Sequence, residues 1–237
     1  MLSTKKIECY IHDLELKDYI MRKILIMNAK GGSGKTTVAT NLAGYFAMKG
    51  ASVALADFDP QGSSIDWLRQ RRGNLPKIIG LEASEKFPKL SNTVDVMIMD
   101  APSRTHDEQI VSLLSITETC IVPVVPSPMD IRAAQRFFGE LRKIRKSVYN
   151  EVKIATIANK TRENSRDAKS LEDLLYSFKL PSGKKFPFLT LLRQSSNYIR
   201  AAQRGMSIFE FAPLTTALDR EYWKPLTEWL ESKKSRP

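Results

Sequence analysis

The sequence predicts an α/β fold, in which a doubly wound, mostly parallel sheet carries helices on both faces. Short apolar segments alternate along the chain with segments in which apolar residues recur at helical spacing. The apolar segments are continuous, as in strands that are buried on both faces. A glycine-rich stretch follows the first of them and precedes a helical segment, and that order is typical of a P-loop NTPase.

The first half of the chain contains four expected strands. The helix after the first strand has Val38, Leu42 and Phe46 on one side and ends at Gly50, because glycine readily adopts the left-handed conformation there. The strands are expected at 22–28, 52–56, 78–80 and 94–99, and the helices at 35–49, 64–72 and 108–116.

The second half continues the same alternation. Strands are expected at 120–125, at 153–158 and near residue 188, and helices at 130–148, 165–178, 196–203 and 216–231. Residues 1–20 are polar and mixed, so we expect an N-terminal extension there. No repeat or linker divides the remainder, which predicts a single domain over 21–237.

Composition excludes several classes of protein. The two cysteines and two histidines are too few for a disulfide framework, a zinc site or a histidine-rich metal centre. We see neither a secretion signal nor an apolar run long enough for a membrane helix, so we expect a cytoplasmic protein. The net charge of +11 is unusual and favours a polyanionic partner, nucleic acid ahead of anionic lipid. A merely basic, solvated surface is the alternative.

The sequence KGGSGKTT at residues 30–37 is the strongest motif. Backbone N–H groups of such a loop surround phosphates, Lys35 reaches the β- and γ-phosphates, and the Thr36 hydroxyl is a magnesium ligand. The strict P-loop pattern fails because Ala29 occupies the position of its first glycine, and Lys30 is an additional lysine. A second lysine suits the phosphates of a nucleotide held by another chain. The expected nucleotide-binding residues of the loop are Gly31, Gly32, Ser33, Gly34, Lys35, Thr36 and Thr37.

Polar residues end three of the expected strands, at the edge where a doubly wound sheet binds ligands. Asp100 closes an apolar strand, as a Walker B carboxylate does, and is expected to orient magnesium. Asp57 and Asp59 leave one face of an extended segment, with Asp57 nearer the magnesium and Asp59 positioned for the attacking water. A helix cap for Asp100 and a simple turn at 59–62 are the alternatives. Asn159 ends the third strand.

Together these segments resemble the ParA/MinD family of deviant Walker-A ATPases over roughly residues 21–230. The matching segments are KGGSGKTT at 30–37, DFDPQG at 57–62, MIMDAP at 97–102 and AQRGMSI at 202–208, which leads to Pro213. The chain departs from the commonest partition pattern at Ala101, and it lacks an N-terminal helix-turn-helix. The segment VVPSPMD at 124–130 looks more like that of small orphan ParA-like proteins.

The resemblance implies a slow, magnesium-dependent ATPase whose dimer holds ATP between two subunits. Lys30 would reach the partner's nucleotide, Lys35 and Asp59 would act in hydrolysis, and Asn159 and Pro213 would contact the adenine. It further implies that the ATP-bound dimer binds DNA without sequence preference. A ParB-like or cargo adaptor protein would stimulate hydrolysis, so that a plasmid, chromosome region or protein complex is positioned on the nucleoid.

The family divides between DNA-binding and membrane-binding members. The C-terminal stretch is short and carries Glu228 and Glu231, which argues against the amphipathic membrane helix of MinD. Arg193, Arg200 and Arg204 fall where the nucleoid branch places its DNA contacts, and Lys143, Arg145 and Lys146 could contribute. A membrane-associated MinD-like ATPase and a metabolic ATPase of the same superfamily remain the alternatives, although two scattered cysteines argue against a cluster-bearing enzyme.

Overall fold

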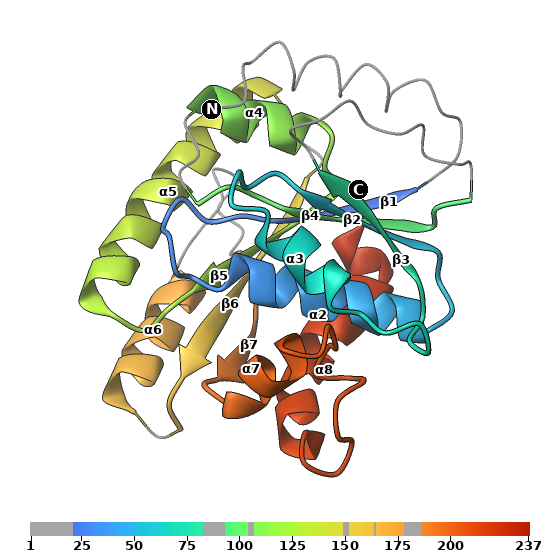
Figure 1. Cartoon of the computed structure of the whole chain (residues 1–237). Helices are drawn as coiled ribbons and strands as arrows, with labels where there is room; N and C mark the ends of the chain where they lie inside the picture. Colours follow the sequence, from blue (N-terminus) through green and yellow to red (C-terminus); the bar gives the residue numbers. More distant parts are fainter. Residues whose placement is uncertain (1–20, 83–92, 104–106, 149–151, 164, 178–185) are drawn as a thin grey trace.

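The computed structural model describes residues 21–82, 93–103, 107–148, 152–163, 165–177 and 186–237. In these residues seven strands form one parallel sheet, in the order β3-β2-β4-β1-β5-β6-β7 (Figure 1). The doubly wound α/β fold expected from the sequence is confirmed. The predicted N-terminal extension over residues 1–20 lies outside the described residues.

The strands agree with the expected segments to within a few residues. They are β1 (Arg22–Ile26), β2 (Val53–Asp57), β3 (Ile78–Glu82), β4 (Val96–Asp100), β5 (Thr119–Val124), β6 (Lys153–Thr161) and β7 (Phe188–Arg193). The largest difference is in β6, which continues through Asn159 and Lys160 to Thr161 instead of ending before them. Pairing with β7 explains the extension, because Thr161 is in register with Arg193 at the end of that strand.

Seven helices and one short 3-10 helix lie within the described residues. They are α2 (Lys35–Met48), α3 (Ser63–Arg69), α4 (Asp107–Ser115), α5 (Pro128–Val148), α6 (Arg166–Ser177), α7 (Ser196–Ala202), α8 (Ala217–Glu231) and η1 (Lys233–Ser235). None of these helices is both long and apolar enough to cross a membrane.

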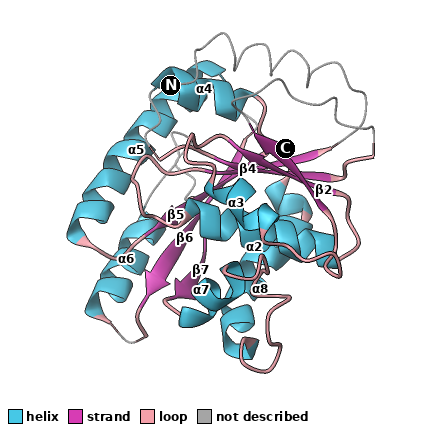
Figure 2. Ribbon diagram, in the orientation of Figure 1, coloured by secondary structure: helices cyan, strands magenta, loops and turns pink. Residues whose placement is uncertain are grey.

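The helices cover the sheet on both faces, and the strand sequences show why. Successive side chains of a strand point to opposite faces, so Ile24 and Ile26 of β1 enter one core and Leu25 and Met27 the other. The first core contains side chains of α2, α3 and α8, and the second contains those of α4, α5 and α6. Figure 2 shows the strands between these two helical layers.

The order of the strands creates a crevice at one end of the sheet. From β1 the chain crosses over β4 to reach β2, whereas β5 lies on the opposite side of β1. In such sheets the crevice lies beyond the carboxyl end of the strand at which the winding reverses. The segment that follows β1 therefore emerges between the ends of β4 and β5, next to Asp100, which is in register with Ile26.

Candidate functional site

The glycine-rich loop between β1 and α2 is shaped by two glycines with positive φ. Gly32 has φ 81° and Gly34 has φ 87°, a region that residues with a Cβ atom rarely adopt. Gly34 is also the N-cap of α2 and makes no side-chain cap, so the first N–H groups of the helix are free to face an anion. This geometry is that of a phosphate-binding loop.

The end of β6 supports the loop from the neighbouring position. The side-chain amide of buried Asn159 donates a hydrogen bond of 2.8 Å to the Ser33 carbonyl. The ammonium group of Lys160 donates to the Gly32 carbonyl at 2.9 Å. Lys160 holds a left-handed backbone, with φ 54°, which is uncommon for a residue other than glycine and is found at functional positions.

The sequence did not single out Lys160 as a functional residue. No motif distinguishes Lys160 from the other lysines in the sequence. Only the folded chain places its side chain against the glycine-rich loop. The contact of Asn159 with adenine, which the family resemblance implies, stays a prediction. In the structure the side-chain oxygen of Asn159 accepts from the Lys160 backbone N–H.

The two lysines of the loop lie in different environments. Lys35 is buried, with 6% exposure, and burial lowers the pKa of its ammonium group, while Asp100 and Asp59 oppose that shift. Lys30 is half-buried, and its backbone N–H donates to the side-chain oxygen of Asn28. Among the described residues no ion pair involves Lys30. Its charge is therefore available to an anion.

Asp100 sits at the centre of the site, at the end of β4. It is 1% exposed, and burial raises the pKa of its carboxyl group to about 7, although the Ser64 and Thr36 hydroxyls oppose that shift. The Ser64 hydroxyl donates to Oδ2 of Asp100 at 2.7 Å. The other oxygen, Oδ1, is buried and has no hydrogen-bond partner in the part of the chain that the structure describes.

Asp57 is in register with Asp100 on the adjacent strand, but its oxygens are used differently. Oδ2 accepts the backbone N–H groups of Ser64 and Ile65, and Oδ1 accepts that of Asp59. Asp57 thus holds the beginning of α3 in place, as a carboxylate at a helix N-terminus does. A position for Asp57 close to magnesium stays a prediction, whereas the anchoring of α3 is a contact that the sequence did not indicate.

Asp59 is half-buried at the mouth of the site. Oδ2 accepts the backbone N–H of Ser103, which follows β4, and Oδ1 accepts that of Gln61. The turn at 59–62 that we had considered as an alternative is therefore present, with the Gly62 N–H donating to the Asp59 carbonyl. Asp59 also lines a cavity of about 310 Å³ in front of α3. Its role in orienting water stays a prediction.

The residues present fit a magnesium nucleotide. Two buried side-chain oxygens in the loop and at the end of β4, Ser33 Oγ and Asp100 Oδ1, lack partners among the described residues. A buried oxygen without a partner is costly, and a bound cation or phosphate would satisfy it. Among the described residues, no group of three or more His, Cys, Asp or Glu side chains is placed so that it could hold a metal ion. Magnesium takes few protein ligands and keeps water and phosphate oxygens, so one carboxylate and one hydroxyl, those of Asp100 and Thr36, fit it.

The three arginines proposed to contact DNA differ in their surroundings. Arg193 is ion-paired with Asp219 at 2.7 Å and with Glu163 at 2.9 Å, so two carboxylates neutralise its charge. Arg200 and Arg204 instead place their guanidinium groups over the same ring, that of Phe211, at 5.6 and 5.3 Å.

The remaining predicted contacts are peripheral or beyond the described residues. Pro213 is exposed, and its carbonyl accepts a hydrogen bond from Arg220. Lys143 is exposed on α5, whereas the side chains of Arg145 and Lys146 lie outside the described residues.

A match to a family model identifies the protein family to which the chain belongs. The model for the CobQ/CobB/MinD/ParA nucleotide binding domain matches residues 24–208. The chain belongs to this family. The family name includes ParA and MinD, so the resemblance expected from the sequence is confirmed. The matched residues include the glycine-rich loop at 30–37.

Individual relatives agree with this assignment. The "Maintenance of carboxysome distribution protein A" of Halothiobacillus neapolitanus is 24% identical over 79% of this chain and 86% of its own length. Apo McdA from Cyanothece has a similar structure, with a TM-score of 0.67 at 16% identity over 89% of this chain and 99% of that one. Cobyrinic acid a,c-diamide synthase from Mycobacterium smegmatis, with a bound ATP analog and magnesium, has a TM-score of 0.65 at 16% identity, over 92% and 98%.

Proposed function

We propose that this protein is a magnesium-dependent ATPase that dimerises around ATP, binds DNA without sequence preference and positions a cargo on the nucleoid. The observation that carries the proposal is the buried pair of groups behind the loop. Lys35 and Asp100 both lie under 10% exposed, and Asp100 keeps one oxygen without a partner in the described residues. A lysine, a carboxylate and a loop of N–H groups are the groups that phosphoryl transfer requires.

Within this proposal each residue of the site has one task. Backbone N–H groups of Gly31, Gly32 and Gly34 and the Ser33 and Thr37 hydroxyls would bind the phosphates, and Lys35 would neutralise their charge. The Thr36 hydroxyl and Asp100 would hold magnesium, which draws electron density from the terminal phosphate when bound. Asp59 orients the attacking water, and its hydrogen bond from the Ser103 N–H fixes the direction of its carboxylate.

Dimerisation is supported by the position of Lys30. One buried lysine, Lys35, already serves the nucleotide of its own chain, and an ammonium group without an ion pair in the described residues points to a second anion. The partner's nucleotide supplies that anion if two loops face each other. The nucleotide then lies between the two subunits.

DNA binding is supported by the net charge of +11 and by the pair Arg200 and Arg204. The contact with the Phe211 ring orders both guanidinium groups. Nη1 of Arg204 also donates to the Arg200 carbonyl at 2.9 Å, and the other N–H groups of the pair are the ones proposed to bind phosphate oxygens. Arg193 is the weakest of the three candidates, because a phosphate would compete with Asp219, a buried carboxylate. The cargo and the adaptor that stimulates hydrolysis are proposed from the carboxysome-distribution relative and from the family.

Salt-dependent DNA binding tests the proposal. The purified protein is titrated with duplex DNA of mixed sequence, in ATP, in ADP and without nucleotide, over a salt series. We expect binding only with ATP. In a plot of the logarithm of the binding constant against the logarithm of the salt concentration, the steepness of the slope should fall by about 0.9 for each phosphate contact removed. Arg200→Ala/Arg204→Ala should therefore lower the slope by about 2 for each subunit of the dimer that contacts the DNA.

The matched control is Lys233→Ala/Lys234→Ala. These exposed lysines lie in η1, and Ser235 of that helix contacts Thr119 at the start of β5, the edge opposite the phosphate loop. The control should bind DNA as the parent does. Absence of DNA binding in every nucleotide state, with ATP-dependent sedimentation on anionic vesicles, would replace the proposal by the membrane-associated alternative; absence of both would favour the metabolic one.

A further inference from the structure

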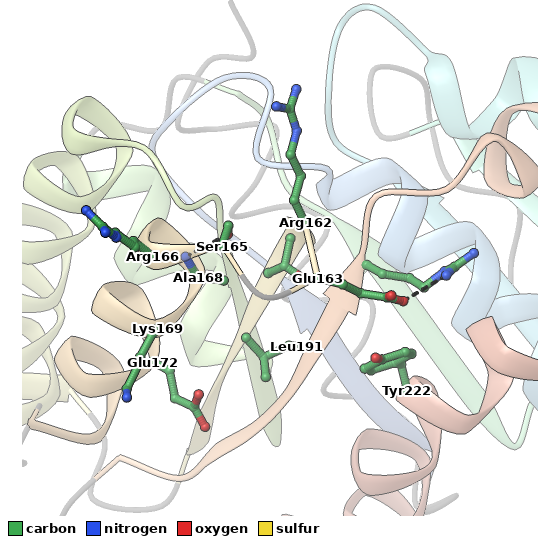
Figure 3. A pocket seen from close by; sticks show the side chains of 11 residues that line it. Arg162, Glu163, Ser165, Arg166, Ala168, Lys169, Glu172, Leu191 and Tyr222 are labelled. Atoms are coloured by element: carbon green, nitrogen blue, oxygen red, sulfur yellow. Dashed lines mark hydrogen bonds and ion pairs between the residues drawn. The ribbon is translucent and has the colours of Figure 1, made fainter.

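A second hollow lies away from the phosphate loop, at the outer edge of the sheet. It has a volume of about 500 Å³ and lies between the ends of β6 and β7, the first half of α6, and Tyr222 of α8 (Figure 3). A hollow of this size accommodates several side chains of a ligand. Neither the nucleotide nor the DNA contacts proposed above use it, apart from Arg193 at its border.

The floor of the hollow is apolar. Figure 3 shows Leu191 near its middle, with Tyr222 to the right on α8 and Ala168 to the left on α6. All three are half-buried or buried, and the Thr190 hydroxyl donates to the Tyr222 carbonyl at 2.6 Å, which ties α8 to β7. Further along α6, exposed Tyr176 packs edge-to-face on Phe188 at 5.0 Å. Apolar surface therefore accompanies β7 over most of its length.

The strand that crosses this floor has an open edge. β7 is the last strand of the sheet, and no described strand pairs with its outer side. A ligand that covers this edge removes water from unpaired N–H and C=O groups, and that is unfavourable unless the ligand supplies hydrogen bonds of its own. An extended peptide does so along its whole length, because it adds to the sheet as a further strand.

The rim of the hollow is positively charged. Arg162, Arg166 and Lys169 are exposed, and no ion pair of theirs occurs within the described residues. Two acidic residues, Glu163 and Glu172, also line the hollow. Glu163 is already paired with Arg193, so only the charge of Glu172 is left to oppose these cations. The surplus of positive charge favours an acidic ligand over a basic one.

We propose that the outer edge of β7 is a docking site for an extended, acidic peptide segment of a partner protein, which adds as an eighth strand. Its apolar side chains would cover Leu191 and Tyr222, and its acidic ones would face the cations of the rim. Arg162 lies two residues from Lys160, whose ammonium group contacts the Gly32 carbonyl. That this partner is the adaptor that stimulates hydrolysis rests on the proposed function, whereas the docking itself does not.

The test uses the whole protein without nucleotide and three fluorescein-labelled peptides of about ten residues, which is long enough to span a strand. The first alternates valine and glutamate, and the second alternates valine and lysine. The third is the glutamate peptide with proline in place of alternate valines, which removes backbone donors. We expect the first to bind and the other two to bind at least about tenfold more weakly. Amide hydrogen exchange should slow selectively at Phe188–Arg193.

Charge reversal on α6 provides a second test of the docking site. Arg166→Glu/Lys169→Glu should weaken binding of the glutamate peptide by about tenfold or more, whereas the matched reversal Lys233→Glu/Lys234→Glu should change it less than about twofold. Both pairs are exposed, so the fold should tolerate them; Arg166→Gln/Lys169→Gln is used if the reversal lowers the melting temperature.

Four results would overturn the proposal. One is equal loss of binding in both reversal variants, which would indicate attraction to net charge alone. The second is no binding of the glutamate peptide, and the third is exchange that slows away from β7. The fourth is displacement of the peptide by inorganic pyrophosphate without slowed exchange at β7, which would make the hollow a small-anion site. A failure of DNA binding would not affect this result, because the peptide is measured without nucleotide or DNA.

Discussion

Asn159 closes against Gly34 so tightly that no side chain fits between them. The Asn159 amide nitrogen donates to the Ser33 carbonyl at 2.8 Å, and a Cβ atom on Gly34 would lie 2.2 Å from that nitrogen. The same glycine has φ 87° and begins α2. The phosphate loop is thus shaped by two residues 125 positions apart, one of which, at the end of β6, does not belong to the motif.

Gly34→Ala should abolish measurable ATP binding. The alanine meets both the cost of the left-handed backbone, about 1 kcal/mol, and the overlap with Asn159. Isothermal titration with ATP and magnesium measures the effect. Gly50→Ala is the matched control, because Gly50 has a similar φ of 85° but nothing within 4 Å of the added Cβ atom.

The control should lose a little stability and keep its ATP affinity. If the two alanine variants bind ATP equally well, the contact with Asn159 does not shape the loop. Asn159→Ser in the Gly34→Ala background removes the amide that overlaps the added Cβ atom. The double variant should therefore recover part of the folding stability that Gly34→Ala alone loses.

Asp59→Ala should keep ATP and DNA binding and stop turnover. Its carboxylate accepts the Ser103 N–H and faces the cavity in front of α3, so removal takes away the group that orients water without disturbing the phosphate loop. Phosphate release under saturating ATP measures turnover. Glu228→Ala, a change at an exposed residue of α8, serves as the control and should hydrolyse ATP normally. Unchanged turnover in Asp59→Ala would refute the assignment.

Lys30→Ala should bind ATP as a monomer. The side chain of Lys30 has no ion pair within the described residues, and the proposed function assigns it to the partner's nucleotide. Sedimentation velocity with ATP, ADP and no nucleotide measures the dimer. For comparison, Lys160→Ala should weaken ATP binding itself, because it removes the contact with the Gly32 carbonyl. Intact ATP-dependent dimers in Lys30→Ala would contradict the argument from two lysines.

Asp100→Asn should stabilise the ligand-free protein, by an amount that depends on pH. Burial raises the pKa of Asp100 from 3.8 to about 7, so the folded state keeps a proton that the unfolded chain has lost. Wild-type stability therefore falls as the pH rises from about 4 to about 7 and then levels off, and asparagine removes that loss.

Urea unfolding without nucleotide or magnesium, at a series of pH values, measures this difference. The stability gained by Asp100→Asn should grow through the window and stay constant above it. A gain that is the same at every pH would show that the fold does not raise the pKa of Asp100. The variant should also lose the effect of magnesium on ATP affinity.

The sequence by itself determined the order of the strands along the chain, the loop at 30–37 and the acidic ends of β2 and β4. These features are local: continuous apolar segments predict buried strands, and the spacing of the glycines and two lysines predicts a phosphate loop between a strand and a helix. The same holds for α2, whose apolar spacing and terminal Gly50 are both visible in the sequence.

Only the tertiary structure decided which residues beyond the motifs complete the site. The contact of Lys160 with Gly32, the hydrogen bond from Ser64 to Asp100 and the ion pairs of Arg193 all join residues from segments that are far apart in the sequence. The open edge of β7 likewise follows from the order of strands across the sheet. Such contacts depend on pairing between distant segments, and a residue's own neighbours in sequence do not encode them.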